Sequence, residues 1–248
     1  MGAQRIVSLA PSITEILFAL RLEPRIVGVT EVCDYPPEAR SKPKVGDYQI
    51  SPEKVVALKP DLVVAHEVLN ARVIPVLKRL GLRVLSANPN RFEKLYAFIR
   101  AIGNATDAVS EASQLVRTMR ARVARVRRQS PKRAPNALFL ISVEPLWAAG
   151  RDTFADEMMT LAGARNALAR AVSGFKAVSL ETALGSAPEL ILLAGPKADA
   201  ILSNPRWQRT PAVKNRRVCE LNPDWVLRES PRSVDGLEQI ALCVRRGT

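Results

Sequence analysis

Short apolar runs alternate with segments of helical periodicity along the first half of the chain. The apolar runs predict strands, and the segments between them predict helices with one apolar face. The predicted strands cover residues 6–9, 26–29, 62–65 and 83–86, and two of the helices cover residues 72–80 and 93–102. Strands that alternate with helices in this way predict a parallel sheet with helices on both faces.

Polar residues and glycines mark where these helices begin and end. Ser12 is followed three residues later by Glu15, a spacing typical of a capping box, so we expect Ser12 to cap the first helix. Gly81 and Gly103 follow two later helices, and a glycine often ends a helix in the left-handed conformation. We therefore expect helices to end at these two glycines.

One much longer helix is predicted at residues 107–129. Its apolar residues recur mostly at steps of three and four, which gives the helix one continuous apolar stripe. At ~1.5 Å per residue the helix is about 35 Å long, and SPKRAP at residues 130–135 ends it. A single helix of this kind resists bending, because bending breaks its ladder of hydrogen bonds.

The second half of the chain repeats the plan of the first. Its predicted elements cover residues 137–141, 154–162 and 218–221, with a final helix from about Val234. We predict an N-terminal α/β lobe at 1–105, a linking helix at 106–130 and a C-terminal α/β lobe at 131–248. The expected fold class is α/β, with two Rossmann-like lobes of parallel sheet, one long rigid helix that joins them, and a ligand cleft between the lobes.

Two stretches that lie 128 residues apart repeat each other without a gap. SPEKVVALKPDLVVA starts at Ser51 and SLETALGSAPELILLAG starts at Ser179. Each predicts a serine N-cap, a short helix, a proline and an apolar strand. Glu53 and Glu181 occupy the same place in the first helical turn of each copy. A unit that is used twice indicates two similar lobes.

The net charge of +13 makes nucleic acid or an anionic membrane a partner to consider. The 37 lysines and arginines are scattered, apart from a dense stretch at 117–133, and no nucleic-acid-binding motif is present. This pattern favours a solvated basic surface and no nucleic-acid partner. No run of about 18 apolar residues occurs, so we expect no membrane-spanning helix.

Cysteine and histidine are too few for most metal sites. Cys33, Cys219 and Cys243 form no CxxC pair and allow at most one disulfide. His66 is the only histidine, which argues against a His-rich metal receptor and against most Ser-His or Cys-His catalysis. The carboxylates are scattered and form no recognisable catalytic set. We therefore expect no enzyme, no metal site and no catalytic cofactor.

The chain begins MGAQRIVSLAPS, and the first predicted strand follows almost at once. This start leaves no room for a signal peptide. We expect either a cytoplasmic protein or the mature form of a secreted protein with a new start methionine.

Several segments, in order along nearly the whole chain, resemble one family. They are IVSLAPSITEILFAL, GVTEVCDYPPEA, KVGDY, PEKVVALKPDLVVA and DWVLRESPR. Together they are similar to the vitamin B12 (cobalamin) periplasmic substrate-binding proteins of bacterial ABC importers. These proteins belong to the helix-linked class of binding proteins, which also contains siderophore and haem receptors. The resemblance implies an extracytoplasmic, monomeric receptor that captures cobalamin or a related corrinoid and delivers it to the permease dimer of an ABC importer.

The resemblance also implies which residues line the ligand cleft. These positions are Ser12, Tyr48, Trp147, Phe175, Asp224 and Arg228. A corrin is a broad and partly apolar disc, so aromatic walls suit it, and its amides and phosphate need a few fixed donors and acceptors. Trp147 follows a predicted strand and is expected on a loop at the carboxyl end of that strand, where open α/β sheets bind ligands.

Each of these positions also has an ordinary structural interpretation. The aromatic residues suit core packing, Asp224 and Arg228 suit a surface ion pair, and Ser12 suits a helix cap alone. For Glu53 and Glu181 the ordinary interpretation is a carboxylate favoured by the helix dipole. The resemblance implies that these two glutamates dock onto arginines of the two permease subunits, and a receptor with two similar lobes fits a two-fold transporter.

The chain departs from the family pattern at several positions. Val32 stands where an aromatic residue is expected, and Tyr48 and Phe175 replace tryptophans. The resemblance therefore implies a smaller or less aromatic pocket. A family disulfide would join Cys243 to position 162, which is Ala162 here, so Cys243 is expected to be a free buried thiol or to pair elsewhere.

Two alternatives remain beside cobalamin binding. A haem or ferric-siderophore receptor has the same fold, but siderophore receptors usually gather several cleft arginines or an axial tyrosine, and Arg228 is the one arginine among the cleft candidates. An enzyme on this scaffold, such as a metal-dependent chelatase or hydrolase, needs titratable groups that converge, and the sequence offers none.

Overall fold

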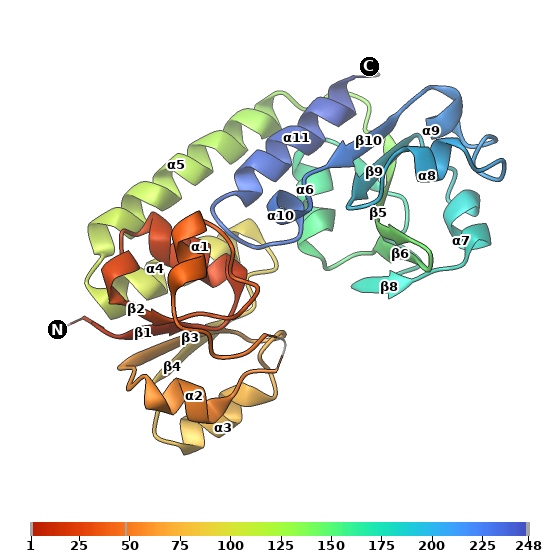
Figure 1. Ribbon diagram of the computed structural model, residues 1–248. Coiled ribbons are helices and arrows are strands. Elements are labelled where there is room, and N and C mark those ends of the chain that lie inside the picture. The colour runs from red at the N-terminus through yellow and green to blue at the C-terminus, as the bar shows by residue number, and fades with distance from the viewer. Residues whose placement is uncertain (1, 48, 247–248) are drawn as a thin grey trace. The chain divides into compact units, whose positions relative to one another are not determined.

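The computed structural model describes residues 2–47 and 49–246, and Figure 1 shows its helices and strands. The chain divides into two compact units, Met1–Met119 and Arg120–Thr248. Each unit has its own sheet and its own buried apolar core. The α/β class and the sheet-containing lobes that the sequence predicts are therefore present.

The sheet of the first unit is parallel throughout. Its strands are β1 (Ile6–Ser8), β2 (Ile26–Gly28), β3 (Leu62–His66) and β4 (Val84–Ala87), in the order β2-β1-β3-β4. All of β3 is buried, which explains its unbroken apolar run in the sequence. The carboxyl ends of the four strands lie at one edge of the sheet.

Helices cover both faces of this sheet, with α1 and α4 on one side and α2 and α3 on the other (Figure 1). The helices of the first unit that precede the unit boundary are α1 (Pro11–Ala19), α2 (Pro52–Ala57), α3 (Val73–Arg79) and α4 (Phe92–Thr106), with short 3-10 helices η1 (Glu23–Arg25) and η2 (Pro37–Ser41). On the α2 and α3 side, Val55 and Leu77 pack in one buried cluster with the strand residue Val63.

The prediction that Ser12 caps α1 is wrong. The N-cap of α1 is Ala10, and no side chain caps this helix. Pro11 occupies the first helical position, where its fixed φ suits the helix and its missing N–H costs nothing. The helix therefore starts before Ser12, which lies inside the first turn and is only 4% exposed.

The prediction that α4 ends at Gly103 is also wrong. The helix continues to Thr106 and ends at Asp107, which takes the left-handed conformation with φ 60°. A Cβ atom at Gly103 would lie 2.6 Å from the Cβ of Ala112, a distance that real side chains do not reach. Gly103 is thus a site of close contact between α4 and the next helix.

The next helix, α5 (Val109–Arg128), is the long one that the sequence predicts. Its first half buries Ala112, Val116 and Met119 in the first unit, and the unit boundary falls directly after Met119. In the second unit, Arg122 of α5 pairs with Asp235 and Glu238 of the last helix. Within residues 2–47 and 49–246, no helix is both long enough and apolar enough to cross a membrane.

The sheet of the second unit is mixed, whereas the sequence predicts a parallel one. Its strands are β5 (Asn136–Val143), β6 (Leu146–Ala149), β8 (Phe175–Ala177), β9 (Leu190–Ala194) and β10 (Val218–Leu221), in the order β10-β9-β5-β6-β8, and β7 (Arg165–Asn166) also pairs with β5. β5, β9 and β10 are parallel, but β6 is antiparallel to both β5 and β8. Only two residues join β5 to β6, which is too short for a parallel crossover.

The helices of the second unit complete its core. They are α6 (Phe154–Leu161), α7 (Leu180–Gly185), α8 (Asp199–Leu202), α9 (Pro211–Lys214), α10 (Pro223–Val226) and α11 (Ser233–Arg245). α11 packs against α6, β9 and β10, and α9 packs against β9. The buried cluster on this sheet includes Leu138, Leu193 and Trp207.

The internal repeat is a true structural repeat. The Ser51 hydroxyl accepts the backbone N–H of Lys54 at the start of α2, and the Ser179 hydroxyl accepts that of Thr182 at the start of α7. The turns that follow these helices also match, because Lys59 and Ala187 both take the left-handed conformation, with φ of 47° and 46°. The two predicted serine caps are confirmed.

The carboxylates that follow the two repeat helices have the same role. Asp61 accepts hydrogen bonds from the backbone N–H groups of Gln4 and Arg5, which lead into β1. Glu189 accepts the backbone N–H of Asn136, the first residue of β5. Each carboxylate therefore fixes the start of the neighbouring strand in its own unit.

The second unit contains a disulfide whose pairing the sequence does not specify. Cys219 of β10 bonds to Cys243 of α11, with their Cα atoms 6.2 Å apart. Cys243 therefore pairs elsewhere than position 162, one of the two outcomes expected for it. Cys33 is a free buried thiol whose sulfur lies within hydrogen-bonding distance of the hydroxyls of Thr14 and Thr30.

Candidate ligand-binding site

Three of the residues predicted to bind ligand gather at one edge of the second sheet. The carboxyl ends of β5, β9 and β10 share this edge because the strands are parallel. Trp147 pairs with Ser142 close to the end of β5, and Asp224 and Arg228 follow β10. Open α/β sheets bind their ligands at the carboxyl ends of their strands, so this edge is the candidate site of the second unit.

The prediction that Trp147 lies on a loop is wrong, although its place at the strand end is as expected. Trp147 belongs to β6, which returns antiparallel beside β5. Its side chain is 38% exposed, whereas Ala148 and Ala149 next to it are fully buried. A strand holds the indole in a fixed direction, which suits a binding surface better than a loop does.

Trp147 and Phe175 form an exposed aromatic pair on neighbouring strands. In the β6–β8 ladder Trp147 lies opposite Ala177, and Phe175 lies opposite Ala149. Alternate residues of a strand share a face, so the two aromatic side chains are diagonal neighbours on one face, at a spacing of roughly 7–8 Å. The alanines between them add little bulk, and Phe175 is 36% exposed. The pair presents a broad apolar surface.

Asp224 and Arg228 form an ion pair at 3.0 Å. Asp224 lies in the first turn of α10, where the side chain of Asn222 accepts its backbone N–H. Arg228 has the more buried side chain of the two, and its backbone carbonyl accepts the hydroxyl of Ser233 on α11. The pair thus offers a ligand both a cation and an anion, held by a capped helix and by α11.

Glu229, next to Arg228, was not among the predicted residues. Its carboxyl is largely removed from water, and this desolvation raises its pKa to about 7, against an opposing hydrogen bond from its own backbone. Only the structure reveals this property, because it depends on how the folded chain excludes water from the side chain. Near physiological pH, both the neutral and the charged form of this carboxyl are populated, next to the candidate site.

The two predicted ligand residues of the first unit have different positions. Ser12 is buried in the first turn of α1, which follows the carboxyl end of β1. Tyr48 lies outside the residues that the structure describes. The ligand role of both residues stays a prediction.

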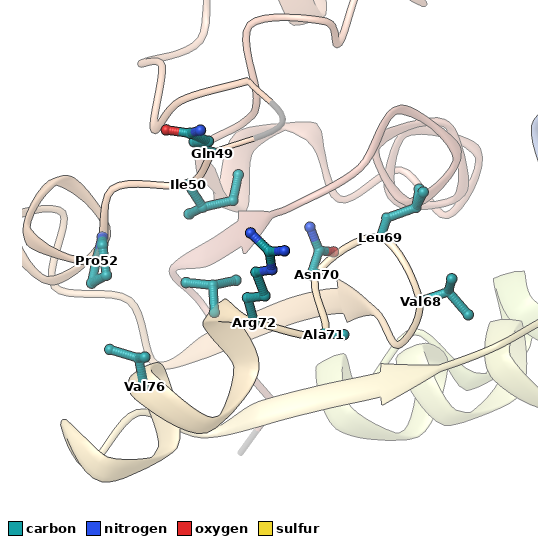
Figure 2. Close-up of a pocket in the computed structure, with 10 residues that line it drawn as sticks. Gln49, Ile50, Pro52, Val68, Leu69, Asn70, Ala71, Arg72 and Val76 are labelled. Atoms are coloured by element: carbon teal, nitrogen blue, oxygen red, sulfur yellow. The ribbon is translucent and has the colours of Figure 1, made fainter.

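The first unit has a hollow of about 640 Å³ near the end of β3, and Figure 2 shows its lining. The lining residues come from the segment before α2, from the turn after β3 and from the start of α3. They are Gln49, Ile50, Pro52, Val68, Leu69, Asn70, Ala71, Arg72, Val73 and Val76. Val68 and Leu69 are 63% and 62% exposed, more than any other large apolar side chain of the described residues.

Hydrogen bonds hold the turn that carries Val68 and Leu69. The Nδ1 atom of His66 accepts the backbone N–H groups of both residues, at 3.2 and 3.3 Å. Asn70 accepts the backbone N–H of His66 at 2.8 Å and donates to the carbonyl of Leu9 at the end of β1. Burial lowers the pKa of His66, against an opposing effect of Glu67, and this favours the neutral ring that accepts these bonds.

Val68 and Leu69 were not predicted as site residues from the sequence, where they lie between the strand predicted at 62–65 and the helix predicted at 72–80. A signal was nevertheless present. They follow a fully buried strand within three residues, at the edge where ligands bind, and two adjacent large apolar side chains after a strand end are unusual on a surface. The sole histidine has a structural role here.

The two repeated glutamates lie at equivalent helix starts but have different partners. Glu53 accepts the Ser51 hydroxyl at 2.8 Å, and hydrogen bonds from its own backbone N–H and from Ser51 lower its pKa. Its counterpart Glu181 has a pKa lowered first by its own backbone N–H and then by Ser179, with a further contribution from Arg206. Both carboxylates are exposed and charged at neutral pH.

Among the described residues, no group of three or more histidine, cysteine, aspartate or glutamate side chains converges as a metal site would.

Comparison with known proteins connects this geometry to a family. Residues 6–225, which make up most of the chain, match the periplasmic binding protein family. The chain belongs to this family. Its two α/β units are thus those of a periplasmic binding protein.

This periplasmic binding protein has relatives along its whole length. It is 37% identical over 248 residues to the uncharacterized ABC transporter substrate-binding lipoprotein YvrC of Bacillus subtilis, with 96% of this chain and 79% of that protein covered. It is 30% identical over 245 residues to a vitamin B12-binding protein of Vibrio cholerae, with 96% and 88% covered. Both relatives are binding proteins, and the first is a substrate-binding protein of an ABC transporter, which confirms the prediction that the chain is not an enzyme.

Solved structures agree with the fold. The periplasmic vitamin B12 binding protein BtuF of Vibrio cholerae matches with a TM-score of 0.88 and 28% identity, covering 98% of this chain and 97% of that one. The periplasmic heme-binding protein RhuT from Roseiflexus sp. RS-1 matches with a TM-score of 0.82 and 28% identity, covering 98% of each chain. The periplasmic binding protein described here therefore shares its fold with receptors of two different tetrapyrrole ligands.

Proposed function

We propose that this protein captures cobalamin or a related corrinoid outside the cytoplasm and delivers it to an ABC importer. The observation that carries the proposal is the exposed aromatic pair Trp147 and Phe175. Trp147 lies at the same edge of the second sheet as the ion pair of Asp224 and Arg228. Aromatic surfaces suit the partly apolar corrin, and the ion pair suits its fringe of amides. The similarity to vitamin B12-binding proteins supports the same ligand.

A haem receptor is the second candidate, and the likeness to the heme-binding protein RhuT favours it. Haem is also a flat tetrapyrrole, so the aromatic pair suits both ligands. The two candidates differ in charge, because haem carries two carboxylates whereas the corrin fringe is mostly neutral amide. The close pairing of Arg228 with Asp224 leaves this arginine partly neutralised, which favours the less anionic ligand.

The test is direct titration of the purified protein with cyanocobalamin and, separately, with haemin. We expect a red complex that co-elutes with the protein and a saturable heat of binding for cyanocobalamin. Saturable binding of haemin without binding of cyanocobalamin would replace the corrinoid with haem as the ligand.

Delivery requires a surface that meets the permease, and we assign this role to Glu53 and Glu181. They occupy equivalent positions in the two units and remain exposed. Two similar carboxylates, one on each unit, fit the two subunits of a permease dimer. Charged groups at the rim of an interface mainly set the rate and the orientation of the encounter.

An extracytoplasmic location follows from the same proposal. The family is periplasmic, and YvrC is a lipoprotein. The disulfide between Cys219 and Cys243 supports this location, because such bonds persist mainly in oxidising compartments.

A further inference from the structure

Among the described residues that line the hollow beside β3, one is cationic and none is anionic. Its described lining is otherwise apolar or an uncharged amide. The cation is Arg72, and Figure 2 shows its side chain rising from the start of α3 toward the segment that carries Ile50. The hollow is therefore locally positive on a mostly apolar background.

Arg72 has no partner of its own in the described part of the chain. No ion pair and no hydrogen bond of its guanidinium occurs there. Arg122 shows the contrasting case, because it is held between Asp235 and Glu238. A guanidinium without a partner keeps its full set of donors for an incoming acceptor.

The surroundings of Arg72 favour one kind of guest. Val68 and Leu69 offer apolar surface on a turn that His66 and Asn70 hold in place. The polar atoms of Asn70 are already used by this turn, which leaves Arg72 and the side chain of Gln49 as the polar groups of the hollow. A molecule with an apolar body and one acidic group complements such a lining.

We propose that this hollow binds an anionic group of the transported ligand, a phosphate or a carboxylate, with Arg72 as its partner. Val68 and Leu69 contact the apolar part of the ligand next to that group. This inference rests on the proposed function, and it concerns the first unit taken by itself. Arginine suits this role because its planar guanidinium donates two parallel hydrogen bonds to a phosphate or a carboxylate.

The two ligand candidates contain this chemistry in different forms. Cobalamin has one phosphodiester in its nucleotide loop, and cobinamide lacks that loop. Haem has two carboxylates, and its dimethyl ester has none. The haemin pair therefore isolates the acidic groups, whereas the corrinoid pair removes the ribose and the base together with the phosphate.

The experiment titrates the wild-type protein and an Arg72→Gln variant with cyanocobalamin, dicyanocobinamide, haemin and haemin dimethyl ester. The matched control is Arg79→Gln, which removes an exposed arginine at the end of the same helix but outside the hollow. We expect Arg72→Gln to lower the affinity about tenfold for the compound that carries the acidic group, cyanocobalamin or haemin. The affinity for the compound without it, dicyanocobinamide or haemin dimethyl ester, should stay unchanged. The loss should shrink as salt is added.

Several outcomes would overturn the anion subsite while the proposed function stands. In the first, Arg72→Gln binds the compound with the acidic group as tightly as the wild type does. In the second, Arg72→Gln loses the same affinity for the compounds with and without that group. In the third, Arg79→Gln loses as much affinity as Arg72→Gln. If wild type binds haemin but no corrinoid, the corrinoid assignment fails and the two haemin compounds decide on Arg72. If wild type binds none of the four compounds, both proposals fall.

A second variant tests the apolar wall. Leu69→Ser should lower the affinity for the compounds with and without the acidic group equally, because it removes apolar contact and no charge. Leu80→Ser is the control, since Leu80 is also exposed on this unit but does not line the hollow. Unchanged affinity in Leu69→Ser, or an equal loss in Leu80→Ser, would remove Leu69 from the site.

Discussion

Arg206 donates a hydrogen bond to the carboxylate of Glu181 at 2.9 Å. No corresponding cation pairs with Glu53 within the described residues; its acceptor oxygen receives the Ser51 hydroxyl instead. The two glutamates are thus equivalent in the repeat but not in their electrostatic surroundings. Under the docking role that we propose for these glutamates, a cation of the permease would compete with Arg206 at Glu181 and would meet no such competitor at Glu53.

We predict that the two docking positions contribute unequally. Arg206→Ala should strengthen the association of the protein with its permease, because it removes the competing cation from an exposed carboxylate.

Glu53→Arg and Glu181→Arg together should abolish uptake while ligand affinity stays unchanged. Transport into permease-containing vesicles and ligand titration are the two measurements. Glu38→Arg together with Glu111→Arg, at exposed glutamates of η2 and α5, is the charge-matched control. Normal uptake by the double variant would refute the docking role.

Trp147→Ala should weaken ligand binding by about 1 kcal/mol or more, which is about fivefold or greater, because an aromatic anchor loses its contact area. Fold stability should change little, since the indole is 38% exposed. Isothermal titration and thermal unfolding measure the two effects. Leu202→Ala on α8 truncates an equally exposed side chain and should leave affinity unchanged. Wild-type affinity in Trp147→Ala would remove this residue from the site.

Reduction of the Cys219–Cys243 bond should lower the free energy of unfolding by about 3 kcal/mol. The bond closes a loop with a sequence separation of 24 residues, which restricts the unfolded chain. Urea unfolding with and without a reducing agent measures the difference. The Cys33→Ala variant should retain the whole difference, because Cys33 is a free buried thiol. Identical unfolding curves in the two conditions would mean that the bond adds no stability.

Glu229 should make the protein less stable as the pH rises from about 4.5 to about 7. Desolvation raises the pKa of its carboxyl to about 7 in the folded state, so the folded protein keeps a proton that the unfolded chain has lost from about 4.5 upward. The stability that this proton provides is fully present below 4.5 and is lost as the pH passes 7. The cost is about 3 kcal/mol at pH 8.

Glu229→Gln isolates this effect, because the amide does not titrate. Urea unfolding at several pH values should show that the variant gains stability over the wild type only above about pH 5. A difference between the two proteins that is the same at every pH would contradict the raised pKa.

The strands were predictable because buried parallel strands leave long apolar runs. β3 and β9 are fully buried, and their sequence repeat places both strands within a residue of the observed ends. The errors arose where one residue type serves two purposes. Pro11 starts α1 earlier than Ser12 suggests, and Gly103 permits close helix contact instead of ending a helix.

The candidate site was predictable only in part, and for a physical reason. Trp147, Asp224 and Arg228 were named from motifs and resemblance, and the topology brings them to one sheet edge. The hollow beside β3 depends on side chains from three separated segments, which no local pattern connects. The choice of Cys219 as the partner of Cys243 likewise depends on how α11 packs on β10.

The left-handed turns at Lys59 and Ala187 make the repeat a target for engineering. A residue with a Cβ atom pays about 1–2 kcal/mol in this conformation, whereas glycine adopts it freely at an entropic cost of roughly 0.5–1 kcal/mol. Glycine at either position should raise the melting temperature slightly, and glycine at both should give the sum of the two gains, since the sites lie in different units. The same duplication that gives the protein two lobes thus supplies a matched pair of positions for making it more robust.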